Sequence, residues 1–242
     1  MKKLILSIIT FIVIISCSSN DGNNTTSTST LKEIVTDSSE ENIIHTKEYF
    51  FDSDGKVLKE VFNSIIFPQY NSTSTFEYDN QGRVIKEIRN NELIINVVWS
   101  GNVATLYGNP IDLSVNNALS YTFLNDKVIE SHFMGDIHKF NYDENDNVIS
   151  EVQADTVFVE YLDYDTTVTN PMHLIKSIGV LRMHSNPYFK NFFQTKKVYP
   201  YQDDDFNFPL SYFQFQKTVN SENKIIKIDN NENYYISRFE YN

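Results

Sequence analysis

The chain has little cysteine and little glycine, and each shortage removes a class of site. Cys17 is the only cysteine among 242 residues, which excludes an intramolecular disulfide and any metal site built from several thiolates. The seven glycines are isolated from one another, so neither a G-x-G-x-x-G loop nor a Walker-type phosphate loop is present. The fold must therefore be stabilised by packing, and no nucleotide cofactor is expected.

Basic residues are also scarce. Lysine and arginine total 20 against 32 aspartates and glutamates, which gives a net charge of −12. Such a surface repels DNA, RNA and anionic lipid headgroups, and the largest basic cluster is the pair Lys196-Lys197. We therefore expect no nucleic-acid partner.

Motifs for catalysis and metal binding are missing as well. The five histidines form no H-E-x-x-H pair, and His132 and His138 have no third ligand nearby. The segment DSDG at 52–55 begins like a calcium loop, but Lys56 stands where a further oxygen ligand belongs. No G-x-S-x-G nucleophile elbow exists. We expect no metal and no cofactor, and an enzyme assembled from residues distant in sequence stays open as an alternative.

What is present begins with an export signal. Two lysines precede an apolar run over residues 4–15, which is too short to span a bilayer about 30 Å thick. This order is typical of a secretory signal peptide, and we assign residues 1–16 to it. The end of the segment, IISC at 14–17, resembles the lipobox of bacterial lipoproteins. That resemblance implies cleavage before Cys17 and a lipid anchor on its thiol; the alternative is an ordinary signal peptide, or a signal anchor, with an unrelated cysteine.

A polar tether follows the signal. Residues 17–30 comprise Cys17 and the segment SSNDGNNTTSTST, which has no apolar side chain to bury. Thirteen such residues give a mean reach of roughly 20 Å. Ser18, rather than aspartate, follows the cysteine, and the resemblance to lipoproteins then implies the outer membrane, in its periplasmic or its cell-surface leaflet. Loss of the signal removes two lysines and takes the net charge to −14.

Residues 31–242 are expected to form one domain, organised by a repeat. Three copies read as strand, turn, strand, at 49–61, 76–88 and 140–152, and a degraded fourth lies at 220–227. In each copy aromatic residues two apart share one face of a strand, as the alternation of a β-strand requires. Antiparallel hairpins should therefore dominate the fold.

The turns of the four copies are expected to share one conformation. In the pattern Asp-x-x-Gly the aspartate bonds nearby backbone amides and the glycine tolerates a positive φ. Asp146 and Asn223 stand at the glycine position of the third and fourth copies. Both residue types visit the left-handed region more readily than other non-glycine residues, so the same turn is expected there.

The segment FEYDNQGRV at 76–84 resembles the YD repeat of RHS-like bacterial surface proteins. With the lipobox and the tether, the chain resembles a family of uncharacterised bacterial lipoproteins that carry a domain of unknown function. The resemblance implies an all-β fold, an antiparallel meander curled into a barrel or half-barrel, and it brings no catalytic residues. Successive turn aspartates lie 27 residues apart from Asp52 to Asp79 and 64 apart from Asp79 to Asp143, so a regular shell around a cargo is not expected.

Two further features refine the expected barrel. Charges stand in mid-strand on both faces, at Lys59 and Glu60 and again in the second copy, and a lipid-facing lysine costs ~2–4 kcal/mol at the bilayer midplane. We therefore expect a barrel that does not span the membrane. A short helix is expected near 186–194, packed on the sheet, because Asn186-Pro187 is a helix start and three phenylalanines at 189, 192 and 193 share a helical face.

Aromatic residues concentrate in one segment. Between Pro187 and Phe215 there are 11 in 29 residues, against 14% for the whole chain. Exposed rings beside acidic groups are typical of a glycan- or peptide-binding surface, and three aspartates stand at 203–205. The alternative is that these rings cover the core. The candidate binding residues are Tyr199, Tyr201, Phe206 and Phe208.

These observations predict a membrane-anchored envelope lipoprotein with a non-catalytic binding or scaffolding role, whose partner in the envelope is a glycan or a protein. The alternative is a hydrolase that acts on envelope or nutrient polymers, either glycan or peptide. A deep pocket with two close carboxylates would favour the hydrolase.

Overall fold

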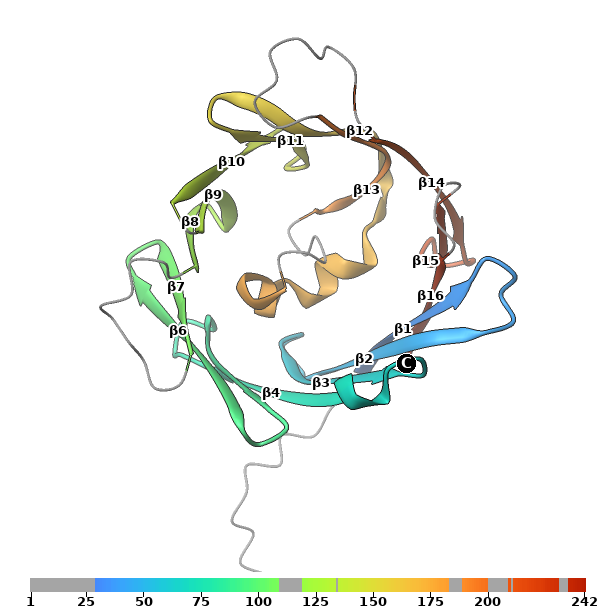
Figure 1. Cartoon of the computed structure of the whole chain (residues 1–242), viewed down its shortest axis with the longest axis horizontal. Helices are drawn as coiled ribbons and strands as arrows, with labels where there is room; N and C mark the ends of the chain where they lie inside the picture. Colours follow the sequence, from blue (N-terminus) through green and yellow to red (C-terminus); the bar gives the residue numbers. More distant parts are fainter. Residues whose placement is uncertain are drawn as a thin grey trace, which may run out of the picture.

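The computed structural model describes residues 29–108, 119–133, 135–182, 189–199, 209, 211–230 and 235–242. Within these residues the chain forms sixteen antiparallel strands, each paired with the next, and β1 pairs with β16 to close a barrel (Figure 1). The expected all-β fold, a meander curled into a barrel, is confirmed, and the barrel is closed rather than half-open.

The strands are β1 (Ser29–Asp37), β2 (Ile43–Phe51), β3 (Val57–Ser64), β4 (Ser72–Tyr78), β5 (Val84–Arg89), β6 (Leu93–Ser100), β7 (Val103–Tyr107), β8 (Leu119–Leu124), β9 (Lys127–Phe133), β10 (Asp136–Tyr142), β11 (Val148–Gln153), β12 (Thr156–Thr169), β13 (Asn191–Val198), β14 (Ser211–Val219), β15 (Ile225–Asn230) and β16 (Tyr235–Tyr241). Two 3₁₀ helices, η1 (Pro68–Tyr70) and η2 (Pro171–Leu181), complete the described elements.

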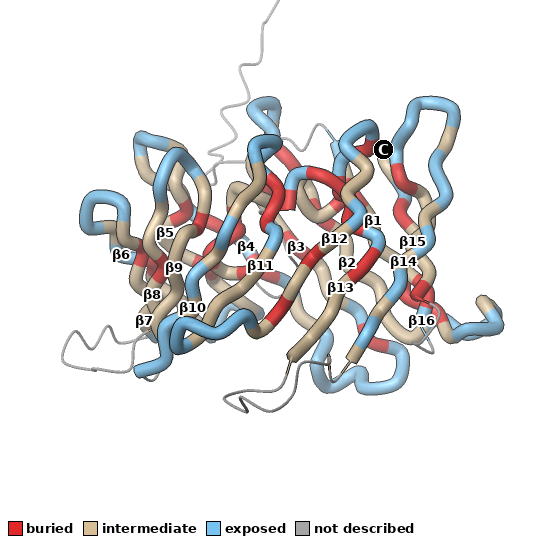
Figure 2. The backbone as a smooth tube through the Cα atoms, turned by 90° about the horizontal axis from the view of Figure 1, so that it is seen from above, coloured by how far each residue is buried: buried red, intermediate tan, exposed pale blue. Residues whose placement is uncertain are grey.

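Because every strand runs antiparallel to the next, the connections fall alternately on two rims. We call the end that carries the β2–β3, β4–β5, β6–β7, β8–β9, β10–β11 and β14–β15 turns the turn rim, and the opposite end the far rim. Figure 2 shows the two rims from the side. Strand β1 begins and β16 ends on the turn rim, where Thr30 and Asn242 exchange backbone hydrogen bonds of 2.6 and 3.0 Å.

One aspartate or asparagine organises each of the four repeat turns. Its side-chain oxygen accepts hydrogen bonds from the backbone N–H groups two and four positions later, all between 2.8 and 3.0 Å. The four residues are Asp52, Asp79, Asp143 and Asn220. The residue three positions later has a positive φ in every copy: Gly55 at +77°, Gly82 at +79°, Asp146 at +69° and Asn223 at +60°. The expected turn, including its two substitutes for glycine, is confirmed.

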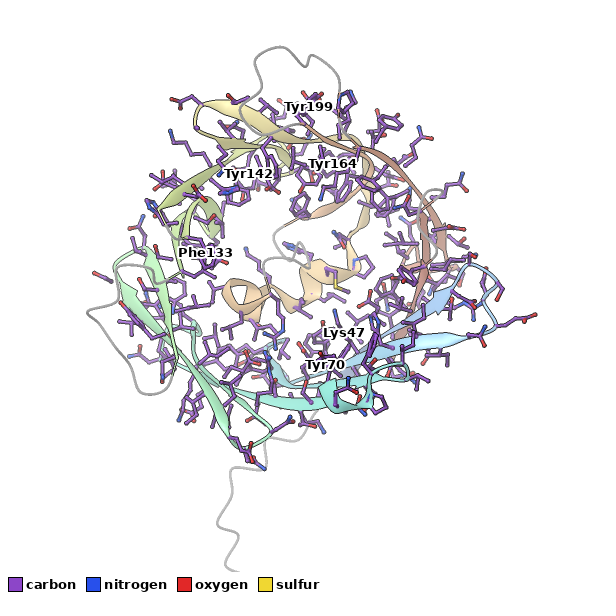
Figure 3. All side chains as sticks on the ribbon, viewed as in Figure 1. Lys47, Tyr70, Phe133, Tyr142, Tyr164 and Tyr199 are labelled. Atoms are coloured by element: carbon purple, nitrogen blue, oxygen red, sulfur yellow. The ribbon has the colours of Figure 1, made fainter. Side chains whose placement is uncertain are left out.

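A ring of aromatic donors links five hairpins, the four repeat copies and the β8–β9 hairpin, to the strand that follows each. In each case the first or second strand residue after the turn is buried, and its carbonyl oxygen accepts a hydrogen bond from a tyrosine hydroxyl or the indole N–H on the next strand. The pairs are Tyr78 with Val57, Trp99 with Val84, Tyr142 with Val128, Tyr164 with Val148, and Tyr241 with Ile225. In Figure 3 the labelled Tyr142 and Tyr164 lie on the inner side of the wall.

These donors explain why tyrosine precedes the turn aspartate in the second and third copies of the repeat. Tyr78 bonds backward to the preceding hairpin while Asp79, the next residue, organises its own turn. Burial raises the pKa of the Tyr78 and Tyr142 hydroxyls, so they stay protonated and able to donate. Each such bond stabilises the fold by about 0.5–1.5 kcal/mol.

The interior is filled by apolar side chains and by η2, which lies inside the ring of strands (orange in Figure 1). Asn170 begins η2 by accepting the N–H of Met172 at 3.0 Å, and Pro171 occupies the first helical position. Ile175 and Ile178 have no exposed surface and join the main core cluster with strands from around the barrel. We call η2 the plug.

The prediction of a helix near 186–194 is wrong in its position. Residues 191–194 open β13, residues 186–188 lie outside the described residues, and the helix inside the barrel is the plug at 171–181. Phe192 and Phe193 are consecutive strand residues, yet both are buried, because one faces the main core cluster and the other a second cluster around Tyr161. Burial on both faces of a strand imitates the apolar spacing of a helix.

Candidate functional site

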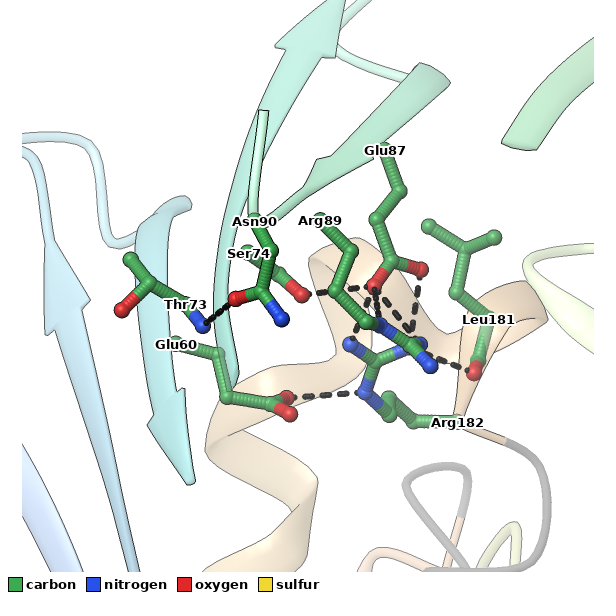
Figure 4. A network of polar contacts seen from close by, with 8 residues as sticks. All are labelled: Glu60, Thr73, Ser74, Glu87, Arg89, Asn90, Leu181 and Arg182. Carbon is green, nitrogen blue, oxygen red and sulfur yellow. Dashed lines mark hydrogen bonds and ion pairs between the residues drawn. The ribbon is translucent and has the colours of Figure 1, made fainter. Parts of the chain in front are cut away.

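The end of the plug is bound to the barrel wall by one arginine. Arg182 donates from Nε to Glu60 at 2.8 Å, and from Nη2 and Nη1 to the two oxygens of Glu87 at 3.0 and 3.1 Å (Figure 4). Glu87 also accepts from Ser74 at 2.7 Å and from Arg89 at 2.8 Å. We call these five residues the Arg182 cluster. The exposed fractions of Arg182, Glu60 and Glu87 are only 6%, 7% and 0%.

The repeat supplies both glutamates. Glu60 and Glu87 occupy the same place in the first and second copies, three residues after the buried valine that follows the turn. Glu151, at that place in the third copy, accepts a hydrogen bond from the Tyr161 hydroxyl at 2.6 Å. The inward glutamate is therefore a property of the repeat, and two copies of it meet at Arg182.

The electrostatics of the cluster exclude general-acid work by Glu87. Burial alone would raise the pKa of Glu87, but hydrogen bonds and charge from Arg182, with bonds from Ser74 and Arg89, lower it to about 2. Burial would likewise lower the pKa of Arg182, and the bonds and charges of Glu87 and Glu60 raise it instead. Glycoside hydrolysis needs a carboxylic acid that is protonated at working pH. The two carboxylates that the fold brings together are therefore a structural pair.

A second contact binds the middle of the plug to the first repeat. The Ser177 hydroxyl oxygen accepts the backbone N–H of Val57 at 3.1 Å, and the Tyr78 hydroxyl lies 3.4 Å from the same oxygen. The plug thus contacts the turn rim at one point and the Arg182 cluster at another. This leaves a cavity on each side of it.

The first cavity, which we call the Trp99 pocket, has a volume of about 450 Å³ and lies between the plug and the turns that follow β4, β6 and β8. Its lining includes Arg83, Trp99, Phe123, Asp126, Lys176 and Ser177. The volume falls within the range of about 300–1,000 Å³ that is usual for small-ligand sites.

The rings of this pocket are held by their neighbours. Trp99 donates its indole N–H to the carbonyl of Val84 at 2.9 Å, and its ring centre lies 5.2 Å from that of Phe123. The Arg83 guanidinium lies 4.8 Å from the Trp99 ring centre, while Nε and Nη2 bond Asp79 at 2.8 and 2.7 Å. The pocket therefore presents a preformed aromatic wall.

The second cavity, which we call the terminal pocket, has a volume of about 630 Å³ and lies where β1 and β16 meet the plug. Its lining includes Leu31, Phe51, Thr169, Leu174, Tyr241 and Asn242. Lys224, which also lines it, is ion-paired with Glu222 at 2.9 Å. This pocket therefore holds no unpaired lysine or arginine.

Of the predicted binding residues only Tyr199 lies within the described part of the chain, and it lines neither pocket. Tyr199 is half-buried at the outer side of the wall (Figure 3), and its hydroxyl donates to Glu160 at 2.5 Å, a bond that raises the pKa of Tyr199 to about 12. Tyr201, Phe206 and Phe208 lie outside the described residues, as does Cys17. The four candidate binding residues therefore stay a prediction.

The residues that build the two pockets were not predicted from the sequence. Trp99 is the only tryptophan of the chain, and an Asn-Pro pair like that at 186–187 also begins the plug at Asn170-Pro171. The glutamates recur after lysine in the first two copies, at Glu60 and Glu87. These signals are visible in the sequence, but nothing local to them shows that they meet.

Exposed apolar side chains gather at the far rim. Of the sixteen large apolar residues exposed in the described part of the chain, eleven lie in or beside far-rim connections. The β3–β4 connection exposes four of them by 53–65%, and no charged residue stands between Glu60 and Glu77. The eleven are Ile43, Ile65, Ile66, Phe67, Tyr70, Leu93, Phe133, Ile137, Val157, Tyr212 and Tyr235. The four residues of the β3–β4 connection are the closest together in the chain, within positions 65–70.

The described residues contain neither a metal-binding cluster nor a membrane-spanning helix. No group of three or more histidines, cysteines or acidic residues is placed to hold a metal ion there. In the same residues, no helix is both long enough and apolar enough to cross a membrane.

The chain is thus an antiparallel barrel closed around a plug. No family model and no curated protein matches it. Among solved structures it is similar to a porin-like protein from Bacteroides uniformis, with 11% identity, a TM-score of 0.40 and coverage of 90% of this chain and 98% of that one. A porin-like protein from Bacteroides vulgatus gives 11% identity, a TM-score of 0.39 and coverage of 87% and 97%.

The Tc holotoxin pore of Photorhabdus luminescens is also similar, at 9% identity and a TM-score of 0.28, over 84% of this chain and 13% of that one. Identities this low place no functional residue of these three proteins on this chain.

Proposed function

We propose that the protein is a lipid-anchored protein of the outer membrane whose plugged barrel is a non-catalytic ligand-binding module. The observation that carries the binding role is the plug, which is bound to the wall by Arg182 and Ser177 and leaves a cavity on each side. The lipobox at 14–17 supports the lipid anchor. Ser18, rather than an aspartate, follows Cys17, and this supports the outer membrane.

The outer face of the wall supports a barrel that stands in water. Ion pairs lie on it at several places around the ring, including Lys32 with Glu240 at 3.7 Å and Lys86 with Glu77 at 3.0 Å. Each of these lysines precedes or follows an inward-facing buried residue, so it points outward. Charges in such positions destabilise a lipid-facing strand. The anchor, rather than the barrel, then attaches the protein to the membrane.

The lipid anchor and the ligand binding are tested in separate experiments. A Cys17→Ser variant is expected to lose metabolic labelling with radioactive palmitate and to leave the membrane fraction. If the variant is still labelled and still sediments with membranes, the lipid-anchor proposal is wrong.

Binding is tested by isothermal titration of the mature protein with neutral disaccharides, acidic disaccharides and dipeptides, followed by chromatography of the recovered ligand. Saturable binding with unchanged ligand is expected. Cleavage of the ligand would contradict the non-catalytic role and favour a hydrolase of glycan or peptide. Absence of binding to all three classes would contradict the binding role.

A scaffolding role is favoured by one observation, the apolar far rim. Ile66 and Phe67 are 55% and 53% exposed, so replacing both with serine is expected to change the free energy of unfolding by less than about 0.5 kcal/mol. The same variant should lower binding of the dye ANS, which reports exposed apolar surface. Leu124→Ser, on the turn rim and 56% exposed, is the matched control. An equal loss of dye binding in the control would argue against a distinct far-rim surface.

A further inference from the structure

We propose that the Trp99 pocket binds a saccharide that bears a carboxylate, with the carboxylate placed at Lys176. This inference rests on the proposed binding function, since it names the ligand class of one of the two pockets. It follows from the charges, the rings and the turn that line this pocket.

Lys176 supplies the free positive charge of the pocket. It is half-buried on the plug, and within the described residues its ammonium forms no hydrogen bond and no ion pair. Its charge helps to lower the pKa of Asp146, but the Asp146 carboxylate is already paired with Lys127. The other basic group of the pocket, Arg83, already bonds Asp79 at 2.8 and 2.7 Å. A half-buried ammonium without a partner, on a chain of net charge −12, is complementary to an anionic group of the ligand.

The one carboxylate in the lining does not cancel this charge. Asp126 is exposed in the β8–β9 turn, where both Asn125 and Asp126 have positive φ angles of 50° and 61°. It forms no ion pair with Lys176, and water screens an exposed charge. The pocket lining therefore combines a half-buried lysine on the plug with an exposed amide and an exposed carboxylate, at Asn125 and Asp126, in the β8–β9 turn.

Two aromatic rings form another part of the pocket wall. Trp99 and Phe123 present apolar area that the Val84 carbonyl and the Arg83 guanidinium hold in place. A sugar ring offers an apolar face for such a wall and hydroxyl groups for the turn oxygens. A carboxylate on that sugar completes the match with Lys176.

The terminal pocket provides the contrast. Its lysine, Lys224, is paired with Glu222 at 2.9 Å and lies 5.3 Å from the centre of the Tyr241 ring. It therefore has no unpaired cation for an anionic ligand. The preference for a carboxylate should belong to the Trp99 pocket alone.

Trp99 makes the test direct, because it is the only tryptophan of the chain and lines the pocket. The mature lipidated protein, in detergent micelles, is titrated with a glucuronate-containing disaccharide and with its neutral glucose counterpart, and tryptophan emission and heat are both recorded. We expect the acidic sugar to bind more tightly and to change the emission.

Three variants separate the contributions. Lys176→Ala should weaken binding of the acidic sugar about tenfold or more and leave the neutral sugar unaffected. Lys176→Arg should retain most of the affinity, since it keeps the charge. Lys139→Ala, on the outer face where Lys139 pairs with Asp155 at 3.6 Å, is the charge-matched control and should bind like the wild type.

Several results would overturn the inference while the binding function stands. These are equal affinity for the two sugars, tighter binding of a zwitterionic dipeptide, heat of binding without a change in Trp99 emission, or an affinity for the acidic sugar that Lys176→Ala leaves unchanged. Absence of any binding by sugars and dipeptides would overturn both proposals.

Discussion

The Tyr78 hydroxyl donates a 2.7 Å hydrogen bond to the carbonyl oxygen of Val57, 21 residues earlier in the chain. Val57 is the first strand residue after the preceding repeat turn and has no exposed surface. Four further aromatic residues make the equivalent bond around the barrel, at spacings of 14 to 16 residues. The bond joins neighbouring hairpins whatever the length of the connection between them, so uneven spacing of the repeats does not prevent closure of the barrel.

Removal of this bond should destabilise the barrel. Tyr78→Phe leaves the buried Val57 carbonyl without the hydroxyl, and we expect the free energy of unfolding to fall by about 1–3 kcal/mol. Tyr70→Phe is the control, because Tyr70 is 65% exposed on the far rim, and its change should be close to zero. Urea unfolding followed by circular dichroism measures the free energy of unfolding of both variants. Equal values would show that the hydrogen bonds from the ring of aromatic donors do not stabilise the fold.

Loss of Arg182 should lower the free energy of unfolding by more than loss of the Tyr78 hydroxyl. Arg182→Met leaves Glu60 and Glu87 facing each other without the cation between them, and removal of one partner from a buried pair destabilises by about 3–5 kcal/mol. The measurement is again urea unfolding. Arg238→Met, on the outer face and 42% exposed at its side chain, removes an arginine from a surface ion pair and should cost less than about 1 kcal/mol.

The free energy of unfolding should depend on pH through Glu87. Its pKa is about 2 in the fold and 4.5 in its ordinary state, so between these values the unfolded chain binds the proton more readily. The contribution is therefore complete above about pH 5 and is lost as the pH falls toward 2, with a total of about 3 kcal/mol. Unfolding free energies measured from pH 7 to pH 3 should decrease less steeply for Glu87→Gln than for the wild type. Parallel curves would contradict the low pKa.

The repeat turn should accept asparagine in place of glycine. Gly55 has a φ of +77° with open space around it, and Asn223 occupies the equivalent position at +60° in the fourth copy. Gly55→Asn should therefore destabilise less than Gly55→Ala, which we expect to cost about 1 kcal/mol, because asparagine tolerates the left-handed region. Thermal unfolding of the two variants ranks them. The reverse order would mean that contacts of the side chain, rather than φ, decide the preference.

Local sequence patterns were sufficient to predict the hairpins but not the plug that fills the barrel. The Asp-x-x-Gly turns and the alternating strands around Asp52 and Asp79 are written in consecutive residues, so the antiparallel meander was predictable. The plug was not, because its apolar residues Ile175 and Ile178 resemble those of any buried strand or helix, while the phenylalanines at 189–193 imitate a helix more closely.

The site depends on contacts between residues far apart in sequence. Glu60 and Arg182 are 122 residues apart, and Glu87 and Arg182 are 95 apart. The repeat shows that Glu60 and Glu87 are equivalent, which is a signal for two inward carboxylates, but their partner lies outside every copy. No spacing rule connects Lys176 with Trp99 either; closure of the barrel around the plug brings them to one pocket.

The measurement that tests this account most directly is amide hydrogen exchange across residues 171–182, followed by mass spectrometry of the mature protein. A plug held by Arg182 and Ser177 inside a closed barrel should exchange as slowly as the strands around it, and Arg182→Met should accelerate that exchange. Exchange in the wild type at the rate of an unstructured peptide would contradict the plug, and with it both pockets and the ligand inferred for one of them.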